Sequence, residues 1–248
     1  MRIATFNAEN LFSRPVAMNQ SELEIGQPIL DDYHQLNRLL KEPIFTDAIK
    51  QQIEILVDKY KLTDRTAEHD ELILREIRGK LWQQHQNGTR TWKAGGSEDF
   101  LGWVELVRDA IDDRAIKNTA RVIAEVSADI QILIEIEDRI TLQRFHDDVL
   151  VAELSQLGRP RYRQVLLMDG NDPRGIDVGL LSRVPVLAMK SHVELRNNAN
   201  NPMFPRDCAQ FLFEIANGQQ LVIFANHFSS QGSDKTGKRR KEQSAEVG

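Results

Sequence analysis

The stretch Ile130-Gln131-Ile132-Leu133-Ile134, followed directly by Glu135, decides the fold class of this chain of 248 residues. Its β-branched residues predict a strand. The residues before it predict a helix, because Asp112 or Asp113 can cap a segment that carries apolar residues on one face up to Val126. A helix that runs straight into such a strand is typical of an α+β or layered α/β fold.

Further strands are predicted on both sides of this segment. They cover residues 2–6, 162–168, 176–181, 211–215 and 221–225, which are short apolar runs. Residues 169–175 contain Gly, Asn and Pro and predict a hairpin between the second and third of these runs. Asn217-Gly218 predicts a hairpin between the last two, because this dipeptide is a strong turn signal between apolar runs.

The middle of the chain has a different pattern. Ile49, Ile53, Leu56, Val57 and Tyr60 follow one helical stripe. Leu74, Ile77 and Leu81 continue this spacing and predict a second helix. We therefore expect a single domain over residues 1–248, with a helical insertion over about residues 15–114 after the first strand.

Composition excludes several classes of protein. The chain is 41% hydrophobic and 28% charged, with a net charge of −5, which is ordinary for a globular protein. No apolar run approaches the roughly 18 residues that a membrane span needs, so no membrane partner is expected. Cys208 is the only cysteine, which rules out an internal disulfide and indicates a cytoplasmic location. The acidic balance argues against bulk attraction to nucleic acid but leaves room for a local basic groove.

Polar residues follow three of the predicted strands. Asn7, Glu135 and the pair Asn226-His227 each come directly after an apolar run. Ligands commonly bind at strand ends, and a carboxylate there suits Mg²⁺ or Mn²⁺. A glutamate leaving the core for solvent and a structural histidine are the competing interpretations. Glu137 and Asp138 are expected to form a solvated loop face.

The combination resembles the endonuclease/exonuclease/phosphatase superfamily. Five blocks occur in the order of that family: residues 3–12 (IATFNAENLF), 129–137 (DIQILIEIE), 174–183 (RGIDVGLLSR), 204–208 (FPRDC) and 226–232 (NHFSSQG). Many members have Gln before the glutamate of the second block, where this chain has Ile134. Each block is weak alone, whereas five in order make a specific pattern.

The resemblance implies a four-layered α/β/β/α sandwich of two mixed sheets, incomplete at its C-terminal end. It implies hydrolysis of phosphodiesters or phosphomonoesters with Mg²⁺ or Mn²⁺. By the same resemblance Glu135 would bind the metal, Asn7 would help to orient metal or nucleophile, and His227 would contact the scissile phosphate. A second group of residues could bind substrate: Asn10, Arg174, Asp177, Arg206 and Asn226. The two arginines could equally form structural ion pairs with Asp172, Asp177 or Asp207.

The family pattern continues with a Gly-Asp-x-Asn block and a terminal Ser-Asp-His block, and neither follows His227 here. We therefore expect a truncated chain that lacks the family's water-activating groups. Three functions stay open: a metal-dependent nuclease, which is the leading hypothesis; a phosphatase or lipid phosphodiesterase on the same scaffold; and a non-catalytic binding module. The expected partner is nucleic acid or another phosphoester substrate, and nothing points to an obligate protein partner.

Overall fold

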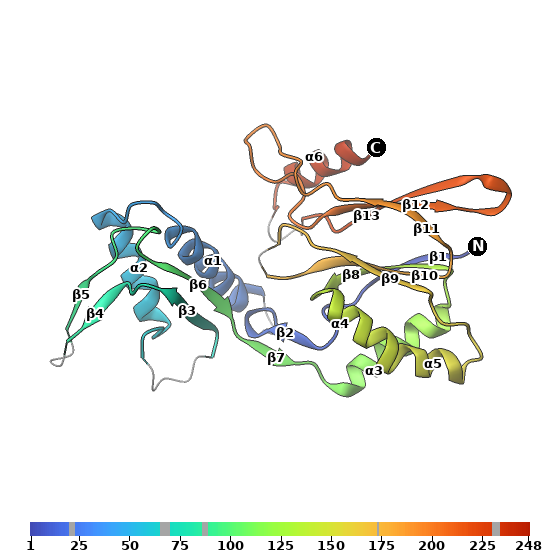
Figure 1. Cartoon of the computed structure of the whole chain (residues 1–248), viewed down its shortest axis with the longest axis horizontal. Helices are drawn as coiled ribbons and strands as arrows, with labels where there is room; N and C mark the ends of the chain where they lie inside the picture. The colour runs from blue at the N-terminus through green and yellow to red at the C-terminus, as the bar shows by residue number, and fades with distance from the viewer. Residues whose placement is uncertain (20–22, 65–69, 86–88, 173, 230–233) are drawn as a thin grey trace. The chain divides into compact units, whose positions relative to one another are not determined.

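The computed structural model describes residues 1–19, 23–64, 70–85, 89–172, 174–229 and 234–248 (Figure 1). The chain forms two compact units. Unit 1 comprises Met1–Ser13 and Ala110–Gly248, and unit 2 comprises Arg14–Asp109. Unit 2 is thus inserted into unit 1 shortly after the first strand. No helix in the described ranges combines the length and apolar character needed to cross a membrane.

A four-stranded mixed sheet organises unit 1. Its order is β1 (Ile3–Asn7), β8 (Ile130–Ile136), β10 (Asp177–Ser182) and β9 (Gln164–Met168). β1 runs parallel to β8, whereas β10 is antiparallel to both of its neighbours. The parallel pair places the carboxyl ends of β1 and β8 side by side, and this is where Asn7 and Glu135 lie.

The second sheet of unit 1 has three strands: β11 (Val186–Lys190), β12 (Cys208–Glu214) and β13 (Gln220–Asn226). All its pairs are antiparallel, so the expected mixed character holds only for the first sheet. The predicted Asn-Gly hairpin is confirmed between β12 and β13. Both Asn217 and Gly218 have positive φ, 66° and 71°, as a tight hairpin turn requires.

Unit 1 has helices on a sheet and that sheet on a second sheet, which are three of the four layers that the family resemblance implies (Figure 1). The helices are α3 (Asp113–Val126), α4 (Arg139–Arg144), the π-helical segment η2 (Phe145–Leu150) and α5 (Val151–Gln156). They pack on one face of the four-stranded sheet around Leu133 and Phe145. The opposite face packs Ile132 and Leu180 against Phe211 of β12. A last helix, α6 (Lys238–Val247), is joined to Ser229 and Met203 through the buried Gln243 side chain.

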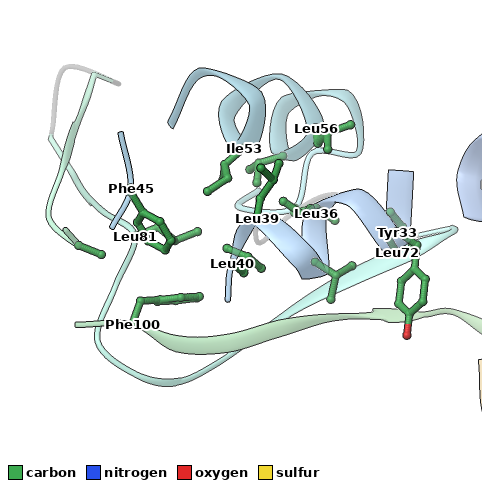
Figure 2. Close-up of a cluster of buried hydrophobic side chains, with 14 of the residues drawn as sticks. Tyr33, Leu36, Leu39, Leu40, Phe45, Ile53, Leu56, Leu72, Leu81 and Phe100 are labelled. Atoms are coloured by element: carbon green, nitrogen blue, oxygen red, sulfur yellow. The ribbon is translucent and has the colours of Figure 1, made fainter. Parts of the chain in front are cut away.

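Unit 2, the insertion expected to be helical, contains short strands as well as helices. Its helices are α1 (Leu23–Leu39) and α2 (Asp47–Lys59), and the second confirms the stripe predicted from Ile49 onwards. Figure 2 shows part of its core, where Leu36 and Leu39 of α1 meet Ile53 and Leu56 of α2. The remaining elements are a 3₁₀ turn (Val16–Met18) and the strands β2 (Ser13–Pro15), β3 (Leu72–Arg78), β4 (Trp82–Gln84), β5 (Arg90–Trp92), β6 (Leu101–Leu106) and β7 (Arg108–Ala110).

The helix predicted around Leu74, Ile77 and Leu81 is wrong. Leu74 and Ile77 belong to strand β3, which pairs antiparallel with β6. Gly79 interrupts the predicted stripe at φ +76°, and a Cβ built there would lie 2.0 Å from the Asp99 carbonyl oxygen. Only glycine fits such a position, so a continuous helix cannot pass through it.

Candidate functional site

Glu135 lies in a β-bulge at the end of β8. Its neighbours Ile134 and Ile136 pair with Val178 and Asp177, which are consecutive in β10, so Glu135 has no opposite residue. Its φ is +61°, a left-handed conformation that is uncommon for a side-chain-bearing residue. The extra residue also reverses the strand's alternation, because Leu133 and Ile136 pack into the same helix-side core. Glu135 thereby belongs to neither hydrophobic core and lies at the carboxyl end of β8.

The turn after β1 lies directly beside this bulge. Asn7 is in register with Ile134, and the Asn10 backbone N–H donates to the Glu135 carbonyl at 2.8 Å. Asn10 has φ +69° and is only 3% exposed. Neither the oxygen nor the nitrogen of its side-chain amide has a hydrogen-bond partner among the described residues. A buried amide left in this state is an unusual feature that calls for a ligand or water.

Glu137 holds that turn in place. Its carboxylate is buried and accepts hydrogen bonds from the backbone N–H groups of Leu11, Phe12 and Ser13 at 2.8, 2.7 and 2.9 Å. The prediction that Glu137 lies on a solvated loop face is therefore wrong. Its neighbour Asp138 caps α4 by accepting from the Thr141 N–H at 2.7 Å. No sequence signal marks a carboxylate whose partners are backbone groups of a distant turn.

His227 comes from the second sheet and meets Glu135. It follows the last residue of β13, and its Nε2 lies 3.6 Å from Glu135 Oε1. Burial, together with the nearby Arg206 and Arg174, lowers the pKa of His227 to about 4. The imidazole is therefore neutral at pH 7 and carries a single N–H. The structure thus brings together two of the strand-end residues that the sequence singled out, the glutamate and the histidine.

Arg174 and Arg206 share one carboxylate, that of Asp172. Arg174 donates to both Asp172 oxygens, from Nε at 2.8 Å and from Nη2 at 2.6 Å. Arg206 Nε lies 3.1 Å from Asp172 Oδ2, without the alignment of a hydrogen bond. Burial alone would raise the pKa of Asp172. The Arg174 hydrogen bonds and the two guanidinium charges outweigh this effect, so the pKa of Asp172 is lower than its usual value. Of the two roles left open for these arginines, the structural ion pair is the one present.

Gly170 allows the loop that carries Asp172 to approach Arg206. A Cβ built at Gly170 would lie 2.8 Å from the Asp207 backbone nitrogen and 2.9 Å from Arg206 Cα. The Asn171 side chain also donates to the Val193 carbonyl at 2.9 Å. This close packing fixes both arginines at the same end of the two sheets as His227.

Asp177 and Asn226, the two remaining residues predicted to bind substrate, form hydrogen bonds to backbone groups. Asp177 is buried, and its Oδ1 accepts from the Gly170 N–H at 2.7 Å. Burial is the main cause that raises the pKa of Asp177 to about 7, and Asp169 and Asp172 add to it. Asn226 pairs with Cys208 in the ladder and donates to the Phe224 carbonyl of its own strand. Residues 230–232 of the block that starts at Asn226 lie outside the described residues.

The donor set fits a loosely held hard cation better than a preformed cage. In the ranges that the structure describes, no group of three His, Cys, Asp or Glu side chains surrounds one point. Glu135 supplies one carboxylate, while Asn7 offers an amide oxygen that already accepts from the Glu9 N–H at 3.0 Å. Mg²⁺ is commonly bound by one or two carboxylates and keeps several waters.

Comparison with known proteins gives structural neighbours only. No protein-family model matches the chain, and no curated protein matches it. One solved structure is an endonuclease/exonuclease/phosphatase from Beutenbergia cavernae DSM 12333, with 18% identity and a TM-score of 0.37 over 53% of this chain and 37% of that one. Another is an endonuclease/exonuclease/phosphatase family protein from Leptotrichia buccalis C-1013-b, with 16% identity and a TM-score of 0.35 over 50% of this chain and 52% of that one. The match thus spans about a third of the first neighbour and about half of the second. Both neighbours bear the family name suggested by the sequence blocks.

Proposed function

We propose that unit 1 is a divalent-metal-dependent phosphoester hydrolase and that its substrate is the phosphodiester backbone of a nucleic acid. The observation that carries this proposal is the contact between Glu135 Oε1 and the neutral His227 Nε2, at 3.6 Å, beside two guanidinium groups. A carboxylate, a neutral imidazole and arginines are the groups that phosphoryl chemistry uses to hold a cation and an anionic substrate together.

The charge balance of the site explains why a cation would be needed. Arg174 and Arg206 face the Asp172 carboxylate, and Glu135 interacts electrostatically with Arg206, so these four groups carry no net formal charge. Glu135 and Asn7 would hold the ion. When bound, a divalent cation polarises a phosphoryl oxygen and supplies the positive charge that an anionic substrate requires.

The protein groups have separate roles in this proposal. His227 donates its N–H to a phosphoryl oxygen on which negative charge develops. Arg174 and Arg206, which Asp172 holds in place, supply positive charge beside the phosphate. The buried Asn10 amide orients water or a substrate oxygen beside Glu135. Glu137 positions Asn10 through the three backbone hydrogen bonds to the turn.

The test is plasmid nicking by the full chain with Mg²⁺ or Mn²⁺, run beside hydrolysis of p-nitrophenyl phosphate. Glu135→Gln should lower nicking by about 10²-fold or more, and His227→Ala by a similar factor. Glu125→Gln is the matched control, because Glu125 is an exposed carboxylate of α3 that pairs with Arg121. Metal-dependent nicking that survives Glu135→Gln would contradict the proposal. Cleavage of the monoester alone would replace the nuclease assignment with a phosphatase.

A further inference from the structure

A polar groove lies in unit 1 between α6 and the turn over residues 196–202, which precedes β12. Its volume is about 550 Å³. The turn contributes Asn197, Asn198 and Asn201 to the lining, and the other side contributes Thr236, Lys238 and Arg239, among others. None of these residues has a role in the proposed hydrolase.

The turn is held in place by its own hydrogen bonds. Asn197 Oδ1 accepts from the N–H groups of Ala199 and Asn201, both at 3.0 Å. The Asn197 N–H donates to the Asn201 carbonyl at 2.9 Å. Asn198 and Asn201 are exposed, so their side-chain amides can bind a ligand without breaking these bonds.

The α6 side of the groove is strongly basic. Asp234 and Glu242 enclose five basic residues in the sequence, whereas the whole chain has a net charge of −5. Those five are Lys235, Lys238, Arg239, Arg240 and Lys241. Asp234 is buried, and its carboxylate accepts from the Arg240 backbone N–H at 2.9 Å. All three lysines are exposed, so this surface attracts an anionic partner despite the acidic balance of the chain.

One short segment connects the groove with the proposed catalytic site. Arg239 Nη2 donates to the Pro202 carbonyl at 3.1 Å, and Arg206 follows four residues later. Burial is the main cause that lowers the pKa of Arg206, and the charges of Arg174 and Arg239 contribute. The Arg239 guanidinium therefore lies within electrostatic range of the arginines at the site.

The helix α6 is also fixed to the segment that carries His227. Its Gln243 is fully buried, and Gln243 Oε1 accepts from the Ser229 N–H at 3.1 Å. Gln243 Nε2 donates to the Met203 carbonyl at 3.0 Å. Since Ser229 follows His227 by two residues, the basic helix and the histidine belong to the same end of unit 1.

We infer that this groove binds the sugar–phosphate backbone of a nucleic acid beside the scissile phosphate. Phosphate oxygens would accept from Lys238 and from Lys241, which lies one turn further along α6. The amides of Asn198 and Asn201 would bond to sugar or phosphate oxygens, so the groove positions the strand and reads no base. The inference rests on the proposed function for its choice of substrate, because a small phosphomonoester would not extend from the site into the groove.

Fluorescence anisotropy of a labelled DNA duplex, titrated with the full chain in EDTA at several salt concentrations, tests this surface without hydrolysis. The logarithm of the affinity should fall linearly with the logarithm of the salt concentration. Lys238→Gln/Lys241→Gln should reduce the steepness of this line by about 0.9 for each lysine and weaken binding at low salt about tenfold.

The matched control is Arg159→Gln/Arg161→Gln, which removes the same charge from the opposite end of the sheet. Both arginines are exposed and precede β9, whose first residue Gln164 pairs with Ser182. Ser182 pairs in turn with Ile130, the residue of β8 farthest from the Glu135 end. The salt dependence of this variant should equal that of the wild type.

A second double variant separates the groove from its bulk charge. Asn198→Ala/Asn201→Ala removes two exposed amides and no charge, so the salt dependence should stay unchanged. Binding should weaken about fivefold at every salt concentration, because the hydrogen bonds are lost. Unchanged binding in either the lysine or the asparagine variant overturns the inference.

Binding in EDTA and nicking with metal are separate readouts, so the inference and the proposed function can fail independently. Glu135→Gln should bind the duplex at least as tightly as the wild type does. If nicking depends on Glu135 but the groove variants bind as the wild type does, the inference is overturned and the proposed function stands. If the wild type does not nick but both groove variants lose affinity as expected, the groove is supported and the hydrolase is not. Absence of saturable binding to both the duplex and its single strand at low salt overturns the inference.

Discussion

Unit 1 and unit 2 differ in the polarity of their buried side chains. Every buried polar or charged side chain among the described residues belongs to unit 1, including Glu137, Asp172, Asp177 and Arg206. The buried side chains in the described part of unit 2 are aliphatic or aromatic, as in the cluster around Leu36 and Phe100. Burying charge is costly unless the charge is paired or hydrogen-bonded. The difference is consistent with the proposal that unit 1 holds the functional site, while unit 2 is stabilised by hydrophobic packing.

The largest expected effect comes from removing the carboxylate that two arginines share. Asp172→Ala should lower the free energy of unfolding of unit 1 by about 3–5 kcal/mol, because it leaves the Arg174 and Arg206 charges without their counter-charge. Hydrogen exchange read by mass spectrometry should show the loss of protection in unit 1. Glu98→Ala in unit 2, an exposed carboxylate, is the control and should change stability by less than about 0.5 kcal/mol. Loss of protection confined to unit 2 would contradict the comparison.

A substitution that creates a cavity in the core of unit 2 should destabilise unit 2 and leave the activity of unit 1 almost unchanged. Leu36 is fully buried, so Leu36→Ala should destabilise unit 2 by about 2–5 kcal/mol. If the site belongs to unit 1 alone, metal-dependent hydrolysis should stay within about twofold of wild type at temperatures where the variant is folded. A large fall in activity with unit 1 still protected from exchange would show that the chemistry depends on unit 2.

The pH dependence of stability should report Asp177. Its pKa is about 7 in the folded chain, against an ordinary value of 3.8, so the folded state retains a proton that the unfolded state has released. Stability should therefore fall as the pH rises from about 4 to 7 and should not fall further for this reason above pH 7. Asp177→Asn keeps an oxygen for the Gly170 N–H and removes the titration. It should match wild type near pH 4 and exceed it by about 2–4 kcal/mol at pH 8. If the variant and the wild type are equally stable at pH 4 and at pH 8, folding does not raise the pKa of Asp177.

The same two units also differ in how well their sequences predict structure. In unit 1 the β-branched strand at Ile130, the Asp112 cap and the Asn217-Gly218 hairpin are local signals, and all three are confirmed. In unit 2 the spacing of Leu74 and Ile77 fits a helix, but the pairing with β6 makes the segment a strand, in which Ile77 is exposed. Gly79 was the local feature that could have warned against the helix.

The sequence identified residues of the candidate site but could not predict how they are arranged. Polar residues after apolar strands pointed to Asn7, Glu135 and His227, and the structure joins the last two. The bulge at Glu135 could not be predicted, because it depends on which core receives Ile136. Asp172 was one of three carboxylates named as possible partners of the arginines, and the structure selects it. Glu137 was missed as a structural residue of the site, since its partners lie in a distant turn.

Manganese binding to the full chain tests the central claim most directly. Titration of Mn²⁺ followed by water-proton relaxation should show one saturable site in the wild type and in Glu125→Gln. Glu135→Gln should weaken that site by at least about tenfold, because it removes the carboxylate that we propose as a ligand of the ion. Equal Mn²⁺ affinity in Glu135→Gln and wild type would contradict a metal-dependent site at the end of β8.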